Sequence, residues 1–161
     1  MNKVILLLII FTACTTEKSN RAEDAAYEFF EMYQARDDWR GFQDLCAEDL
    51  VFEDVIYRLN FGKQEFIDFY NWPDSAFSKH PDFPTTLVLK ELALTDSSAI
   101  GRGYFNPFYY SGALLSFDHR WRFNISLEFN AEGKIIRHID FIEYPPEYLK
   151  MVSDMLLKEV N

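Results

Sequence analysis

His138 and Asp140 stand two residues apart in the segment 134–144, and their types suit acid–base chemistry. If this segment is a strand, side chains two apart share a face, so the imidazole and the carboxylate lie together. A carboxylate in an apolar pocket has a raised pKa, and a neighbouring imidazole can then exchange protons with it. The opposite face, with Ile135 and Ile139, is also apolar. Alternation alone therefore does not decide which face points inward.

Other reactive residue types lack the spacing that metal or nucleophile chemistry requires. His80, His119 and His138 have no helical i,i+4 spacing and no cysteine partner, and neither HExxH nor CxxC occurs. A glycine-rich phosphate loop and a GxSxG motif are also absent from the sequence. We therefore expect no metal and no cofactor. Cys46 stands among acids in an apolar stretch that we expect to be helical, which indicates a buried small hydrophobe.

The first fourteen residues have the layout of a secretory leader. Lys3 precedes an apolar run of eight residues over 4–11, too short for a bilayer core, which needs about 20. The quartet ending at Cys14 resembles the lipobox of bacterial lipoproteins, although Phe11 stands where leucine is usual. That resemblance implies a signal peptide over 1–13, a lipid on Cys14 and a polar tether over 14–20. The expected location is the bacterial cell envelope, outside the cytoplasm. An ordinary cleaved leader with an unmodified cysteine is the alternative.

Composition predicts one globular domain over 21–161 and argues against nucleic-acid partners. The chain has 161 residues, of which 48% are hydrophobic and 26% charged. Its formal charge of -10 repels phosphate backbones, and no basic patch offsets it. Aromatic residues make up 17%, a fraction that suits an aromatic-lined cavity.

The chain divides into a helical first part and a strand-rich second part. Asn20 and Glu23 have the spacing of a capping box and predict a helix to about residue 36. Asp37 or Asp38 can cap a second, shorter helix, and a third is expected near 63–72. Strands are expected over 50–57, 87–95, 99–105, 121–129 and 134–144, with an irregular loop over 72–84 and a last helix after Pro145. This order predicts an α+β domain.

The order of elements resembles the nuclear transport factor 2-like, or SnoaL-like, superfamily over about residues 22–144. The residues that carry the resemblance are LVFED at 50–54 followed by FIDFY at 66–70, and FNAEGKI at 129–135 followed by Asp140. It implies a cone-shaped, curved mixed or antiparallel sheet wrapped around N-terminal helices, in the cystatin-like α+β roll arrangement. It also implies a conical cavity that is open at one end. Isomerases, cyclases, epoxide hydrolases, dehydratases and non-catalytic binders share this scaffold, so function does not follow from it.

Matching to the ketosteroid isomerases of this superfamily selects candidate site residues. Their catalytic base falls on Asp54, and cavity-lining positions fall on His138, Asp140 and Ile142. On this interpretation the three ionisable groups meet in an aromatic pocket. The two hydrogen-bond donors of those isomerases fall on apolar side chains, at the cavity positions Phe30 and Ile125, which argues against steroid isomerisation.

Further aromatic residues are candidates for the cavity wall. Tyr57 suits the rim, and Trp121 suits the wall, with core packing as the alternative for each. The aromatic bend over 105–110 is expected to form either the cavity mouth, a packed loop or an exposed contact patch.

Three hypotheses of function remain open at this point. The first is binding of a small apolar molecule. The second is cofactor-free acid–base catalysis by Asp54, His138 and Asp140. Its alternative is that these residues only stabilise the structure. The third is a protein-interaction module, for instance a homodimer, that uses the open sheet face with Arg122 and Glu128.

Overall fold

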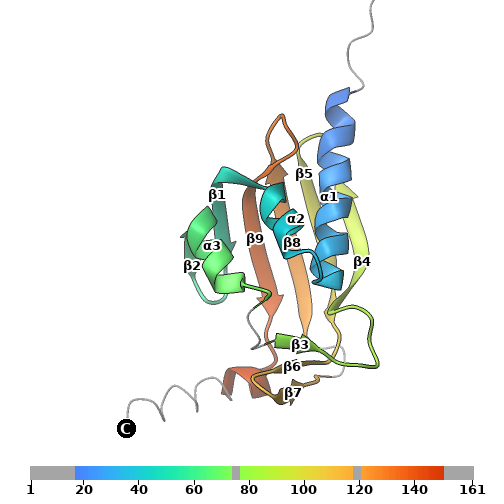
Figure 1. Cartoon of the computed structure of the whole chain (residues 1–161), viewed down its shortest axis with the longest axis vertical. Coiled ribbons are helices and arrows are strands. Elements are labelled where there is room, and N and C mark those ends of the chain that lie inside the picture. The colour runs from blue at the N-terminus through green and yellow to red at the C-terminus, as the bar shows by residue number, and fades with distance from the viewer. Residues whose placement is uncertain (1–16, 74–76, 118–120, 151–161) are drawn as a thin grey trace, which may run out of the picture.

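In the computed structural model, residues 17–73, 77–117 and 121–150 are described. They form a long curved sheet with helices on one face and a small second sheet near one end (Figure 1). The segment expected to be a leader, Cys14 and the chain beyond residue 150 lie outside the described residues. The α+β class expected from the sequence is confirmed.

Three helices cover the concave face of the sheet: α1 (Glu17–Ala35), α2 (Trp39–Leu45) and α3 (Lys63–Tyr70). The buried residues of α1 follow helical spacing and are Ala22, Ala25, Ala26, Phe29, Phe30 and Tyr33. The capping box expected at Asn20 is wrong, because α1 already includes that residue. Residues 17–20, expected as part of a tether, are therefore helical. The cap of α2 is confirmed at Asp38, whose carboxylate accepts the Gly41 N–H at 2.8 Å.

The main sheet has the strand order β2-β1-β9-β8-β5-β4. Neighbouring strands are antiparallel except β1 and β9, which are parallel. The strands are β1 (Cys46–Asp54), β2 (Leu59–Gly62), β4 (Leu87–Leu94), β5 (Ser98–Phe105), β8 (Arg122–Phe129) and β9 (Ile135–Glu143). The four-residue edge strand β2, which pairs with β1 and leads into α3, was not expected from the sequence.

The pairing of β9 decides which of its faces points inward. Its burial alternates so that His138, Asp140 and Ile142 face the helices, while Phe141 is half exposed on the outer face. The face chosen from the family resemblance is therefore confirmed. A bulge opposite the end of β8 shifts the register at the start of β9, so Ile135 is buried and Ile136 only partly so. Simple alternation assigned these two isoleucines the other way round.

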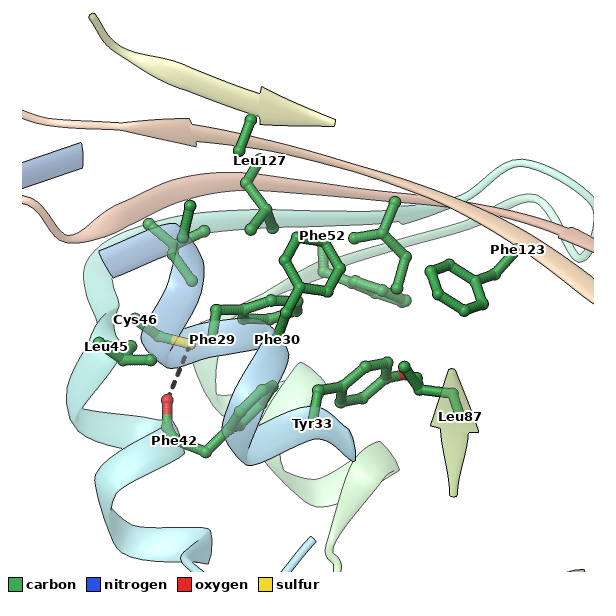
Figure 2. Close-up of a cluster of buried hydrophobic side chains, with 14 of the residues drawn as sticks. Phe29, Phe30, Tyr33, Phe42, Leu45, Cys46, Phe52, Leu87, Phe123 and Leu127 are labelled. Carbon is green, nitrogen blue, oxygen red and sulfur yellow. Dashed lines mark hydrogen bonds between the residues drawn. The ribbon is translucent and has the colours of Figure 1, made fainter. Parts of the chain in front are cut away.

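Aromatic and aliphatic side chains from α1, α2 and the sheet fill the space between the two layers. Figure 2 shows Phe29 and Phe30 of α1 facing Phe52, Phe123 and Leu127 of the sheet. Phe30 lies over Gly101, where an added Cβ would stand only 2.1 Å from its ring. Phe30 is thus a core residue whose ring occupies the place that a side chain at position 101 would need.

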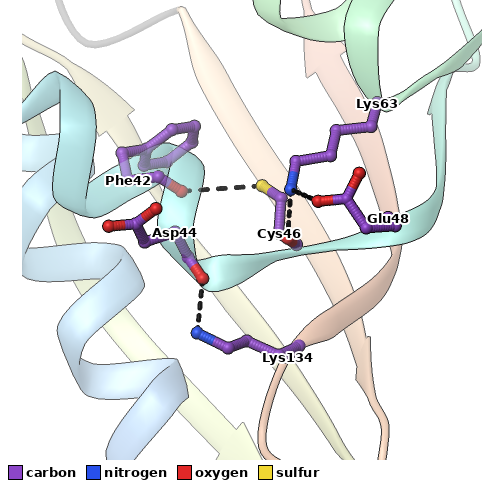
Figure 3. Close-up of polar contacts among 6 residues, drawn as sticks. All are labelled: Phe42, Asp44, Cys46, Glu48, Lys63 and Lys134. Atoms are coloured by element: carbon purple, nitrogen blue, oxygen red, sulfur yellow. Dashed lines mark hydrogen bonds and ion pairs between the residues drawn. The ribbon is translucent and has the colours of Figure 1, made fainter.

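Cys46 is buried at the junction between α2 and β1, where lysine side chains donate hydrogen bonds to backbone carbonyls at the end of the helix and the start of the strand. Cys46 is buried as expected, but it begins β1 instead of lying in a helix. Its Sγ faces the carbonyl of Phe42, and burial raises its pKa to about 12 (Figure 3). Lys134 donates to the Asp44 carbonyl, and Lys63 donates to the Cys46 carbonyl and to Glu48. The thiol is therefore protonated and unreactive near neutral pH.

A second, three-stranded sheet stands beyond one end of the main sheet, in the strand order β3-β6-β7 (Figure 1). Its strands are β3 (Phe77–Lys79), β6 (Phe108–Tyr110) and β7 (Ala113–Leu115). β3 falls in the region expected to be an irregular loop. Residues 146–150 are helical after Pro145, as expected. The small sheet and this helical segment enclose the space beside the end of the main sheet, where the cavity described next is found.

Candidate functional site

A cavity of about 320 Å³ lies between the small sheet, the ends of α1 and α3, and the main sheet. This volume is within the range of small-molecule pockets. Much of its wall is aromatic or aliphatic. The lining residues are Tyr33, Arg36, Tyr57, Asp68, Phe69, Tyr70, Asn71, Phe77, Thr86, Leu87, Phe105, Phe108, Tyr110, Leu115, Trp121, Ile142, Tyr144 and Tyr148.

Asp140 is the centre of a buried polar cluster behind this wall. Its Oδ1 lies 2.6 Å from His138 Nε2, and its Oδ2 accepts the Tyr70 hydroxyl at 2.5 Å. Tyr33 in turn donates to the Tyr70 oxygen at 3.1 Å. A continuous line of hydrogen bonds thus runs from the cavity wall, through two phenols and a carboxylate, to His138.

The ring of His138 is enclosed by aromatic side chains. Its centroid lies 5.1 to 5.4 Å from the rings of Phe29, Phe52 and Phe66, and the residue is 1% exposed. A polar ring in such surroundings needs a hydrogen-bond partner, and Asp140 provides one. This arrangement makes the pair part of the core.

Asp54 holds a turn together. It pairs with Asp140 across the parallel strands β1 and β9, but the two carboxylates bind different partners. Asp54 Oδ1 accepts the backbone N–H groups of Ile56 and Tyr57 at 2.9 and 2.8 Å. Its Oδ2 accepts the hydroxyl of Tyr144 at 3.0 Å. These bonds form the Asx-type closure of the turn that follows β1.

The structure brings Asp54, His138 and Asp140 close to the cavity but not into its wall. All three are buried, and none belongs to the lining residues. Tyrosines stand in front of the two acids: Tyr70 before Asp140 and Tyr144 before Asp54. A ligand in the cavity therefore meets the phenols of Tyr70 and Tyr144 instead of the carboxylates of Asp140 and Asp54.

The other residues expected at the cavity divide into two groups. Tyr57, Trp121 and Ile142 line it, with Tyr57 at 38% exposure suited to the rim. Phe30 and Ile125 do not line it; both are fully buried between α1 and the sheet. The aromatic bend also contributes, since lining residues come from both β5 and β6. The bend was expected at the cavity mouth, in a packed loop or in an exposed patch; in the structure Phe105, Phe108 and Tyr110 line the cavity, with Phe108 buried and Tyr110 48% exposed.

Tyr33, Tyr70 and Tyr144 of the cavity wall are neutral hydrogen-bonding groups over the ordinary pH range. Burial raises the pKa of Tyr33 and of Tyr70, and the charge of Asp140 raises both further. Burial also raises the pKa of Tyr144, and Asp54 adds to that shift. None of them can serve as a base near neutral pH, because the phenolate form is too unfavourable.

Stability should fall in alkali because of these tyrosines. In the unfolded chain each ionises near its ordinary pKa of 10.0, whereas in the folded chain the pKa is higher. The folded state thus holds more protons above pH 10, and each such tyrosine then costs about 1.4 kcal/mol of unfolding free energy per pH unit. Urea unfolding followed between about pH 9 and pH 11 measures this slope. The Tyr70→Phe variant should show a shallower loss, and an equal slope in both proteins would contradict the assignment.

Two hydrogen-bond donors on the cavity wall have no partner among the described residues. They are the Nε of Arg36 and the Nε1 of Trp121, both buried. Neither Arg36 nor Tyr70 was among the site residues expected from the sequence. Tyr70 meets Asp140 across 70 residues of sequence, and Arg36 precedes two acids that offer it obvious partners. No local pattern identifies either residue.

The described residues contain no group of three or more His, Cys, Asp or Glu side chains arranged to hold a metal ion. Over the same ranges, none of the helices is both long enough and apolar enough to cross a bilayer.

Comparisons with known proteins identify the fold and leave the function open. No family model matches the chain, and no curated protein matches its sequence. Solved structures do match. An LEH-like epoxide hydrolase of M. tuberculosis is 11% identical in sequence and has a TM-score of 0.63. The match covers 88% of this chain and 98% of the hydrolase chain. A SnoaL-like polyketide cyclase of Shewanella putrefaciens CN-32, so described provisionally, is 13% identical with a TM-score of 0.60, covering 84% and 97%.

A third similar structure is named as a provisional ketosteroid isomerase of Kribbella flavida DSM 17836. It is 18% identical with a TM-score of 0.55, and it covers 80% of this chain and 85% of its own. The names of these structures cover three different reaction types. At such identities the likeness concerns the fold alone.

Proposed function

We propose that this chain, a nuclear transport factor 2-like domain, binds a small, mainly apolar organic molecule in its aromatic cavity. The observation that carries the proposal is a cavity of about 320 Å³ whose wall combines apolar side chains with two unpartnered donors. Ligand pockets typically have this composition, in which apolar walls supply affinity and a few polar groups fix the orientation.

The geometry supports binding more than acid–base catalysis. A general base must come within hydrogen-bond reach of the proton that it removes. Asp54, His138 and Asp140 are each bonded within the protein and stand behind the cavity wall. Binding needs none of the three to reach the ligand.

Two neighbouring leucines of β7 provide a sharp test. Leu115 is 4% exposed and lines the cavity, whereas Leu114 is 49% exposed and does not. The Leu115→Trp variant should fill the cavity and lower the affinity for a neutral apolar probe, naphthylacetamide, by roughly a hundredfold. Isothermal titration calorimetry on the purified full-length chain measures it.

The matched control is Leu114→Trp, which adds the same ring on the exposed side of the same strand and should keep wild-type affinity. Circular dichroism and thermal unfolding show whether both variants are folded. Unchanged affinity in a folded Leu115→Trp protein would mean that the probe binds elsewhere and that the proposal is wrong.

The proposal also includes a membrane anchor, which rests on the sequence of the leader. A lipid on Cys14 would hold the domain at the membrane of a bacterial cell envelope. The full-length chain expressed in a bacterium should sediment with membranes and incorporate a radiolabelled fatty acid. The Cys14→Ser variant should lose both properties, while Cys46→Ser should keep them because Cys46 is buried in the domain. Label retained by Cys14→Ser would contradict the anchor.

A further inference from the structure

Arg36 occupies an unusual position at the end of α1. It has a φ of 50°, in the left-handed region, and its N–H donates to the Met32 carbonyl at 2.7 Å. Glycine or asparagine is the common choice for such a helix end, because other side chains are strained in this backbone conformation. The sequence nevertheless has an arginine there, and its side chain lines the cavity.

The guanidinium of Arg36 does not serve to cap its own helix. Thr86 binds two of the last carbonyls of α1, donating from its Oγ1 to Tyr33 and from its backbone N–H to Gln34. Lys79 binds the next one, at Ala35, at 2.7 Å. The acceptors that an arginine at a helix C-terminus ordinarily takes are thus already occupied.

Two aromatic rings hold the guanidinium in place. Its Cζ lies 3.9 Å from the centroid of the Phe77 ring and 5.4 Å from that of Trp72. Stacking of this kind fixes the plane of the group and leaves its N–H edges available. Among the described residues no carboxylate forms an ion pair with it, and its Nε is buried without a partner. Burial lowers the pKa of Arg36.

We propose that Arg36 binds the anionic group of the ligand, so that the cavity takes a small apolar monocarboxylate. This inference rests on the proposed binding function and adds the class of ligand. Arg36 is partly buried, its Nε has no partner among the described residues, and a carboxylate is the partner whose two oxygens match the guanidinium edge.

The rest of the wall favours a single negative charge at that end. The Tyr33 hydroxyl donates to the Tyr70 oxygen and the Tyr70 hydroxyl donates to Asp140, so neither proton is left for a ligand carboxylate. Asp68, at the same cavity, is also an acid, and the whole chain is negatively charged. A phosphate dianion would meet one cation and these acids, whereas a monocarboxylate is neutralised by Arg36 alone.

The test compares an acid with its neutral amide, so that only the anionic group changes. The probes are naphthylacetate against naphthylacetamide, and decanoate against decanamide, titrated into the full-length chain at neutral pH. The wild-type protein should prefer each acid about tenfold or more. In Arg36→Met the ratio of acid affinity to amide affinity should fall to about one.

Arg58 provides the matched control. It is an exposed arginine with a φ of 56°, and it does not line the cavity. Arg58→Met changes the same side chain in the same backbone conformation and should keep the preference for acids. Arg36→Lys keeps the positive charge but lacks the planar guanidinium that binds both carboxylate oxygens, so it should retain part of the preference for acids over amides.

The possible outcomes separate the two proposals. Equal binding of acid and amide by the wild-type chain, or a preference that survives in Arg36→Met, overturns the anion subsite and leaves the apolar cavity proposal intact. Failure of all four probes to bind the wild-type chain overturns both. The wild-type comparison does not depend on the folding of any variant.

Discussion

Replacing Asp140 by valine is expected to lower the free energy of unfolding by about 3–5 kcal/mol, the largest single effect that we predict. Asp140 is 0% exposed and binds both His138 and Tyr70. Without it, two buried polar groups lose their partner, and each carries an uncompensated desolvation cost. Urea unfolding followed by circular dichroism measures the change.

A double variant shows whether Asp140→Val destabilises the protein because His138 loses its hydrogen-bond partner or because the Asp140 side chain itself is removed. In His138→Phe/Asp140→Val the imidazole is replaced by a ring that suits its surroundings of Phe29, Phe52 and Phe66. The double variant should be more stable than Asp140→Val alone, by about 1 kcal/mol or more. Glu143→Val is the control, because this exposed acid of the same strand should change stability by less than about 0.5 kcal/mol. A double variant less stable than the single one would contradict this account.

Replacing Asp54 by alanine is expected to cost about 2–4 kcal/mol, because three hydrogen bonds to one carboxylate are lost. The isosteric Asp54→Asn should cost only about 1 kcal/mol, since its amide oxygen can still accept the two backbone N–H groups of the turn. Urea unfolding of the two variants measures the difference. Affinity for naphthylacetamide should be nearly unchanged in Asp54→Asn, because the residue is outside the cavity wall.

The pattern of these two results tests the role of Asp54. Equal destabilisation by Asn and Ala would show that the charge, and not the turn geometry, is what the fold needs. A large loss of probe affinity in Asp54→Asn with normal stability would place the carboxylate at the ligand after all.

Much of the fold follows from local patterns in the sequence. The alternation of β8, the turn at Gly133 with its φ of 82°, and the Asp38 cap are each determined by neighbouring residues. Elements set by pairing with distant segments were less predictable. β2 and β3 are short, and each forms only because a partner strand is available. The bulge that buries Ile135 likewise depends on the register with β8.

The candidate site was predictable in part. The family resemblance indicated that His138, Asp140 and Ile142 face inward, as they do in the structure. Tyr57 and Trp121, chosen from their places in the sequence pattern with packing as the alternative, line the cavity. The resemblance did not indicate the layer of tyrosines, Tyr70 and Tyr144, that separates Asp140 and Asp54 from the cavity. Tyr70 lies on the helix α3, and its hydroxyl reaches Asp140 only because α3 packs against this part of the sheet. Such a layer depends on side-chain length and helix position, which spacing along the sequence does not encode.

The three tryptophans offer the most direct measurement of whether the cavity binds a small molecule. Trp121 lines the cavity with an unpartnered indole N–H, whereas Trp39 and Trp72 do not line it. In the nitrogen–proton correlation spectrum of the full-length chain, titration with naphthylacetamide should shift the Trp121 indole signal saturably and leave that of Trp39 in place. Assignment by Trp121→Phe identifies the signal. A Trp121 signal that stays unmoved at saturating probe would contradict the proposed function.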